Sequence, residues 1–142
     1  MNSKLLVRLL ERVYQIQAEE TELMFRAYLV EEDKRKKETL FEIYKDSELH
    51  TLILEDIIRE FTRDSKELKG RCNISYDLEN LFGFERINTI VRIHNMVLDL
   101  YRRILNYIGE ENELIRSKIL DMVRREEEHS KKLEELSISW YS

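Results

Sequence analysis

The chain has no proline in 142 residues, and its only glycines are Gly70, Gly83 and Gly109. Proline ends helices, and both residue types are frequent in the turns between strands. Apolar side chains recur at the three- and four-residue spacing of a buried helical face in four segments. We therefore expect an all-α fold whose helices cover approximately residues 3–33, 40–69, 87–108 and 115–140.

The connections between these segments predict the topology. The charged run 31–38 is expected to hold the first turn, although one continuous helix in a coiled-coil assembly is an alternative. Residues 69–76 are expected to form a loop and 77–82 a short helical turn closed by Gly83, whereas Gly109 is expected to end the third helix. Short first and last connections and a long middle one predict a four-helix bundle with one long crossover. The expected single domain, 1–142, comprises a hairpin (3–69), a crossover (70–84) and a second hairpin (85–140).

An internal repeat agrees with two related hairpins. A shift of 79 residues aligns the second helical segment with the fourth and brings His50 onto His129. A shift of 73 residues aligns the first segment with the third and brings Tyr28 onto Tyr101 and Thr21 onto His94. We expect the hairpins to be related by a pseudo-twofold axis.

Composition narrows the classes of function. The net charge is −5 with both signs interspersed, which predicts no nucleic-acid partner. No apolar run approaches the roughly 20 residues that span a bilayer, so no membrane partner is expected. Cys72 is the single cysteine, which excludes an internal disulfide and favours a cytoplasmic location.

The three histidines, His50, His94 and His129, each interrupt the apolar stripe of a different segment. An unpaired buried polar group costs about 1–3 kcal/mol, so buried imidazoles need partners. Glu126 lies three residues before His129 and projects from the same helical face. Further polar residues interrupt the stripes at Gln17, Glu20, Thr21 and Ser47. Carboxylate and imidazole ligands together suit Fe, Mn, Zn or Co better than Ca or Mg.

The Glu126-x-x-His129 pair within a Leu/Ile-spaced helix resembles the motif of the ferritin-like superfamily, which includes rubrerythrins and bacterioferritins. That resemblance implies a four-helix bundle with one crossover. It also implies two metal ions, held by a Glu on helices one and three and by Glu-x-x-His on helices two and four. Tyr101 follows His94 by seven residues, as a tyrosine often follows the family's lead Glu. Two positions depart from the motif: Ser47 stands where a Glu is expected, and so does His94.

The motif with these departures predicts one asymmetric metal site rather than a symmetric di-iron centre. The expected ligands are His94, Glu126 and His129, with His50 across the bundle and Glu20 as a fifth ligand or the holder of a second ion. The residues expected to support them are Ser47, Thr21, Tyr28 and Tyr101. Fe or Mn is the expected metal and Zn the alternative.

Two functions remain open at this point. One is a ferritin-like metal-binding protein engaged in oxidation, peroxide removal or metal handling. The other is a non-catalytic interaction module whose polar layer sets helix register. Homodimers are expected for bundles of this kind.

Overall fold

A computed structural model describes residues 3–62, 83–109 and 112–139. Within these residues the fold is all-α: α1 (Ser3–Val30), α2 (Lys34–Thr62), α3 (Gly83–Tyr107) and α4 (Glu113–Ser139). The helix α3 begins two residues before the expected second hairpin at 85. The expected loop 69–76, the turn 77–82, Cys72 and Trp140 lie outside the described residues.

The turn between α1 and α2 occupies residues 31–33, so the chain reverses there and does not form one continuous helix. Acidic side chains form this turn without glycine or proline. The Asp33 side chain accepts a hydrogen bond from the backbone N–H of Lys36 (3.1 Å) and caps the start of α2. Glu31 accepts one from the backbone N–H of Asp33 (3.1 Å). The first helix accordingly ends at Val30 rather than at the expected residue 33.

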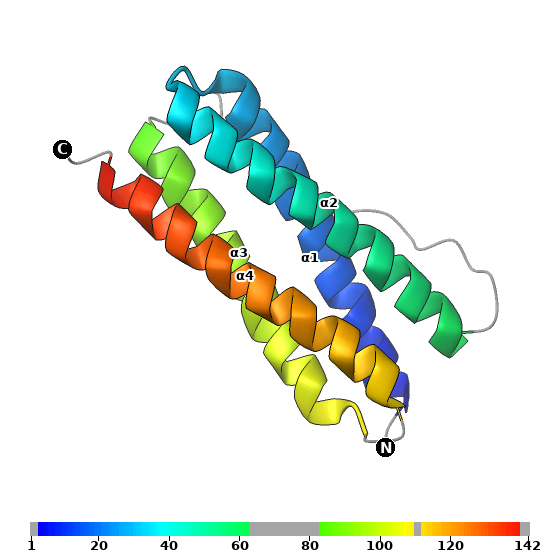
Figure 1. Cartoon of the computed structure of the whole chain (residues 1–142). Helices are drawn as coiled ribbons and strands as arrows, with labels where there is room; N and C mark the ends of the chain where they lie inside the picture. The colour runs from blue at the N-terminus through cyan, green and yellow to red at the C-terminus, as the bar shows by residue number, and fades with distance from the viewer. Residues whose placement is uncertain (1–2, 63–82, 110–111, 140–142) are drawn as a thin grey trace.

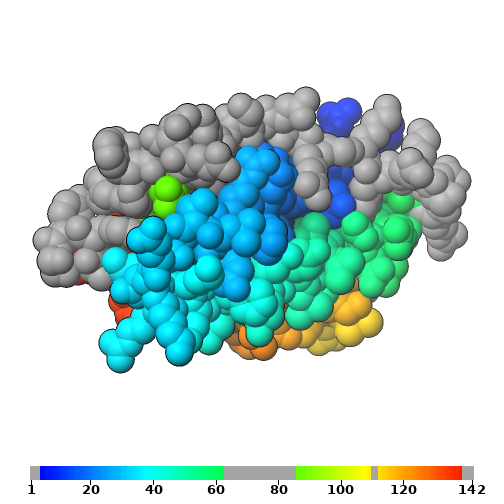
Figure 2. Space-filling model, turned by 90° about the horizontal axis from the view of Figure 1, so that it is seen from above, coloured from blue at the N-terminus to red at the C-terminus, as the bar shows by residue number. Residues whose placement is uncertain are grey.

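The helices pack as a four-helix bundle (Figure 1). The helix α1 lies against α2 and α3, and α4 lies against α3 and α2. Each of these neighbouring pairs runs antiparallel, whereas α2 and α3 run in the same direction. From above, α1 and α2 lie side by side along one face of the molecule (Figure 2). The connecting residues 63–82 are not described, so the predicted crossover itself stays a prediction.

The apolar core is divided into two clusters along the bundle. The larger cluster contains Leu6, Leu10, Leu54, Ile104 and Ile119 among others, all fully buried. The smaller cluster lies towards the 31–33 turn and contains Met24, Ala27, Leu40, Ile43, Ile87, Ile90, Leu133 and Leu136. Buried polar side chains lie near the middle of all four helices, and on α2 and α4 they stand between the residues of the two clusters.

Among the described residues, none of the helices has a stretch that is both long and apolar enough to cross a bilayer.

Replacing Leu54 by Ala tests the assignment of the larger cluster. Leu54 is fully buried, so we expect the free energy of unfolding to fall by about 2–5 kcal/mol because a cavity is left behind. Leu114 is 70% exposed and serves as the control; its change to Ala should alter stability by less than about 0.5 kcal/mol. Equal losses in the two variants, measured by denaturant unfolding, would contradict the assignment.

Candidate metal centre

The layer between the two apolar clusters is built from every helix of the bundle. It consists of polar residues that are at most 3% exposed: Gln17 and Glu20 from α1, Ser47 and His50 from α2, His94 from α3, and Glu126 and His129 from α4. Each replaces an apolar residue of a buried stripe, so the helical spacing that builds the core also brings these side chains to one level.

Hydrogen bonding fixes the imidazole of His94. Its Nε2 lies 2.7 Å from the backbone oxygen of Glu126, and a carbonyl only accepts, so Nε2 carries hydrogen and donates. The opposite nitrogen, Nδ1, lies 3.1 Å from Oε2 of Glu126 and 3.3 Å from Oε2 of Glu20. A bare Nδ1 lone pair would repel both carboxylates. A proton on Nδ1 or a cation between the three atoms therefore completes this arrangement.

The imidazole of His129 is held in a comparable way, by Asp46. Its Nε2 donates to Oδ2 of Asp46 (2.9 Å), a carboxylate that also lies 3.5 Å from the guanidinium of Arg125. Its Nδ1 is buried without a hydrogen-bond partner and lies 3.9 Å from Oε2 of Glu126. A carboxylate that binds one imidazole nitrogen and leaves the other bare is the usual support of a metal-ligating histidine.

Sequence reasoning missed Asp46. A signal was present, because Asp46 and Arg125 are related by the same shift of 79 residues that relates His50 to His129. Both pairs meet in the structure, the first as an ion pair and the second with ring centroids 6.4 Å apart. Repeat mates on α2 and α4 thus face each other at this level of the bundle.

The Glu20 carboxylate is oriented by a chain of hydrogen bonds. Its Oε1 accepts from the hydroxyl of Ser47 (3.2 Å) and from the amide of Gln17 (3.4 Å). The hydroxyl of Tyr101 donates to the amide oxygen of Gln17 (2.8 Å), which turns the amide nitrogen towards Glu20. These contacts leave Oε2 of Glu20 facing His94.

Three atoms in the layer that could bind a metal ion have no hydrogen-bond partner. These buried atoms are Oε2 of Glu20, Oε2 of Glu126 and Nδ1 of His129. One donor atom from each of Glu20, His94 and Glu126 lies within 4.8 Å of the others, so this group could hold a metal ion. Metal bonds of about 2.1 Å place neighbouring ligands about 3.0–3.4 Å apart. The separations of 3.1 and 3.3 Å from His94 fall inside that range.

The carboxylates dominate the electrostatics of the layer. Burial works to lower the pKa of His94, but the neighbouring Glu20 and Glu126 outweigh it and raise that pKa to about 9. Burial works to raise the pKa of Glu126, but the neighbouring imidazoles of His129, His50 and His94 outweigh it and lower that pKa to about 2. Without a metal, an imidazolium at His94 therefore lies between carboxylates at neutral pH.

Other expected site residues occupy different places. His50 contacts Glu126, with its Nδ1 2.7 Å from Oε1. The hydroxyl of Thr21 donates to the backbone oxygen of Gln17 (2.8 Å) instead of contacting the layer. Tyr28 lies nearer the 31–33 turn, where its ring packs beside Phe25 and Phe41. Of the two adjacent α1 positions, Glu20 supplies the carboxylate that meets His94.

Comparisons with protein-family models, curated proteins and solved structures found no match to this chain.

Replacing Asp46 by Asn tests the hydrogen bond between Asp46 and His129. Burial lowers the pKa of His129, whereas Glu126 and Asp46 raise it above its usual value. The change removes one of the two carboxylates, so we expect the pKa of His129 in metal-free protein to fall. Asp56→Asn alters an exposed carboxylate paired with Arg59 and serves as the control. An unchanged His129 titration in Asp46→Asn, followed by NMR, would contradict the contact.

Proposed function

We propose that this chain is a ferritin-like metal-binding protein that holds one transition-metal ion inside its helical bundle. Glu20, His94 and Glu126 would bind the ion, and His129 would complete its surroundings. The observation that carries the proposal is the convergence of buried donor atoms that lack hydrogen-bond partners. Native cores rarely leave such atoms unpaired, because each costs about 1–3 kcal/mol.

The charges in the layer favour a divalent cation. Glu20 and Glu126 contribute two negative charges, and neutral His94 and His129 would add two nitrogen ligands without charge. Two carboxylates balance a divalent ion, so the buried group would carry no large net charge. The mixture of nitrogen and oxygen donors favours Fe or Mn, with Zn as the alternative, over Ca or Mg.

The ferritin-like assignment is supported by two features. The helices α2 and α3 run in the same direction, as a bundle with one crossover requires (Figure 1). Glu126 and His129 both face the layer from α4. Ser47 donates to Glu20 and supplies no carboxylate, which favours a single ion over a carboxylate-bridged pair.

The surrounding residues would favour redox chemistry on a metal ion that is shielded from water. Iron or manganese held by imidazole and carboxylate ligands would supply redox chemistry towards oxygen or peroxide. Tyr101 and Gln17 hold Glu20 in place. Burial, together with the carboxylates of Glu126 and Glu20, raises the pKa of Tyr101 well above its usual value, which keeps it a neutral donor. The apolar clusters on both sides exclude water from the layer. Oxidation, peroxide removal and metal handling are the functions we propose for such a site.

One observation favours a second candidate function, a non-catalytic interaction module. A protonated His94 between Glu20 and Glu126, with His50 against Glu126, pairs most charges in the layer without a metal. Such a layer would set the register of the helices and the choice of partner.

Metal titration separates the two functions. We expect metal-free protein to take up about one Fe(II), Mn(II) or Zn(II) per chain and to gain thermal stability, because only the folded chain presents the site. Glu126→Gln should weaken binding by about 100-fold, and Asp46→Asn by about 10–100-fold through loss of the support for His129. Glu127→Gln changes the exposed neighbouring carboxylate and should leave affinity unchanged.

Circular dichroism of each variant shows whether the bundle is intact, and His129→Asn provides a second, smaller change at the site. If the wild-type chain takes up none of these ions and a chelator leaves its Tm unchanged, the metal-binding proposal fails and the interaction module is favoured.

A further inference from the structure

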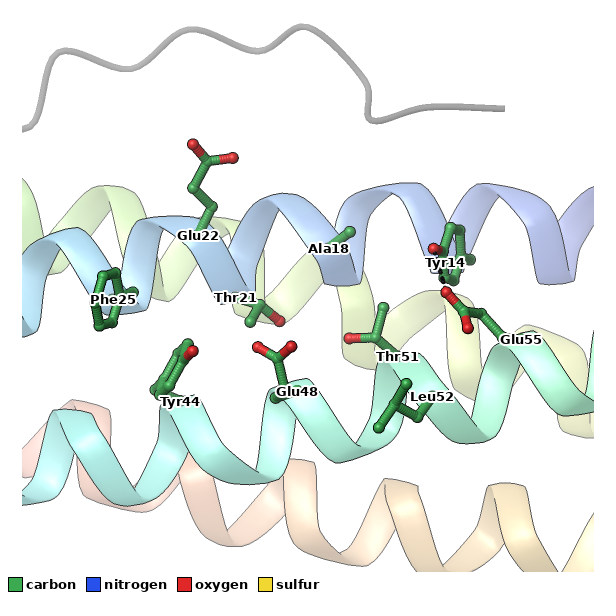
Figure 3. Close-up of a pocket in the computed structure, with 10 residues that line it drawn as sticks. All are labelled: Tyr14, Ala18, Thr21, Glu22, Phe25, Tyr44, Glu48, Thr51, Leu52 and Glu55. Atoms are coloured by element: carbon green, nitrogen blue, oxygen red, sulfur yellow. Dashed lines mark hydrogen bonds between the residues drawn. The ribbon is translucent and has the colours of Figure 1, made fainter. Parts of the chain in front are cut away.

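The outer face of the α1–α2 hairpin is hollowed by a groove of about 400 Å³ (Figure 3). Three carboxylates border it, those of Glu22, Glu48 and Glu55, together with the side chains of Thr51 and Leu52. Leu52 is 54% exposed although it is apolar. The groove lies between α1 and α2, and none of its lining residues belongs to the buried polar layer, so it is separate from the proposed metal centre.

An aromatic cluster adjoins the groove on the same face. Phe25, Tyr28, Phe41 and Tyr44 form a closed set of ring contacts with centroids 5.1–6.2 Å apart. Phe25 and Phe41 remain 39% and 37% exposed. Phe25 and Tyr44 also line the groove, so the cluster and the groove are continuous. Exposed apolar surface of this kind is typical of an interaction site.

Two lysines give the aromatic cluster a positive charge. The ammonium of Lys37 lies 4.8 Å from the ring centroid of Tyr28, and that of Lys45 lies 5.2 Å from the ring centroid of Phe41. The face therefore has a basic, aromatic half towards the 31–33 turn. Its other half is the acidic groove.

The order of residues along α2 makes these halves complementary. The outer face reads Lys37, Phe41, Lys45 and then Glu48, Leu52, Glu55, at spacings of three and four residues. The midpoint of the pair Lys45 and Glu48 falls between residues 46 and 47, and the pair Phe41 and Leu52 has the same midpoint. A twofold axis through that point would bring Lys45 of one chain to Glu48 of another, and Phe41 to Leu52. Lys37 would then lie near Glu55.

We propose that this face binds a second copy of the chain, with the aromatic cluster of each copy against the groove of the other. A twofold interface requires a surface that complements itself, and both charge and apolar contact meet that requirement here. A partner that was uniformly basic or uniformly acidic would be repelled by one half of the face. The proposal does not depend on a bound metal.

Charge reversal within the full chain tests the pairing. We expect sedimentation velocity over a concentration series to show a dimer of the wild-type chain. Lys45→Glu and Glu48→Lys should each weaken dimerisation by about tenfold, because each places like charges together twice across the axis. An equimolar mixture of the two variants should restore dimers, as should the double variant Lys45→Glu/Glu48→Lys. Arg103→Glu, at an exposed pair on α3, is the matched control and should not change the dimer.

Phe41→Ser extends the test to the apolar contact and should also weaken the dimer. A wild-type chain that stays monomeric throughout the series would overturn the proposal. A dimer unaffected by either charge reversal would overturn it too, since another face would then form the interface. If mixing the two charge-reversal variants restores the dimer, Lys45 of one chain must lie opposite Glu48 of the other, which would support this pairing.

Discussion

The carboxylate of Glu126 at the centre of the bundle holds the polar layer together. Its Oε1 pairs with Nδ1 of His50 at 2.7 Å, and its Oε2 lies 3.1 Å from Nδ1 of His94. The backbone oxygen of the same residue accepts from Nε2 of His94. Glu126 is fully buried, and a buried carboxylate without partners would cost several kcal/mol. The positions of α2 and α3 relative to α4 are therefore tied to this one side chain.

Around Glu126 the bundle gives up part of its apolar core. Residues at the centre of each helix are polar, and the hydrocarbon core is split into a large and a small cluster. Hydrogen bonds offset much of the free-energy cost of burying these polar groups: Ser47 and Gln17 donate to Glu20, and His129 donates to Asp46. The cost is not fully offset, because some carboxylate and imidazole atoms have no hydrogen-bond partner where these side chains meet. A bound cation would pair them, and this is the physical basis of the proposed function.

Helical periodicity predicted most of the fold. Leu40, Ile43 and Leu54 were placed on a buried stripe, and they lie in the core. The same stripes placed His50, His94, Glu126 and His129 inside the bundle, and all are buried. The 31–33 turn was poorly located because Asp33 and Glu31 form it through side-chain capping, which leaves no glycine or proline in the sequence.

The candidate site was less predictable because its details depend on helix rotation. Glu20 and Thr21 are adjacent and differ in direction by about 100°, so packing decides which one meets His94. Asp46 lies at the edge of its stripe and is partly exposed, so a search for buried polar residues does not find it, and only the 79-residue repeat points to it. Tyr28 sits on the same stripe as the site residues, yet it lies too far along α1 and joins the aromatic cluster.

Anomalous X-ray scattering from crystals grown with Mn(II) or Fe(II) would locate a bound ion directly. We expect one strong peak per chain inside the bundle, in contact with Glu20, His94 and Glu126. An empty layer, or peaks confined to carboxylates on the surface, would contradict this expectation.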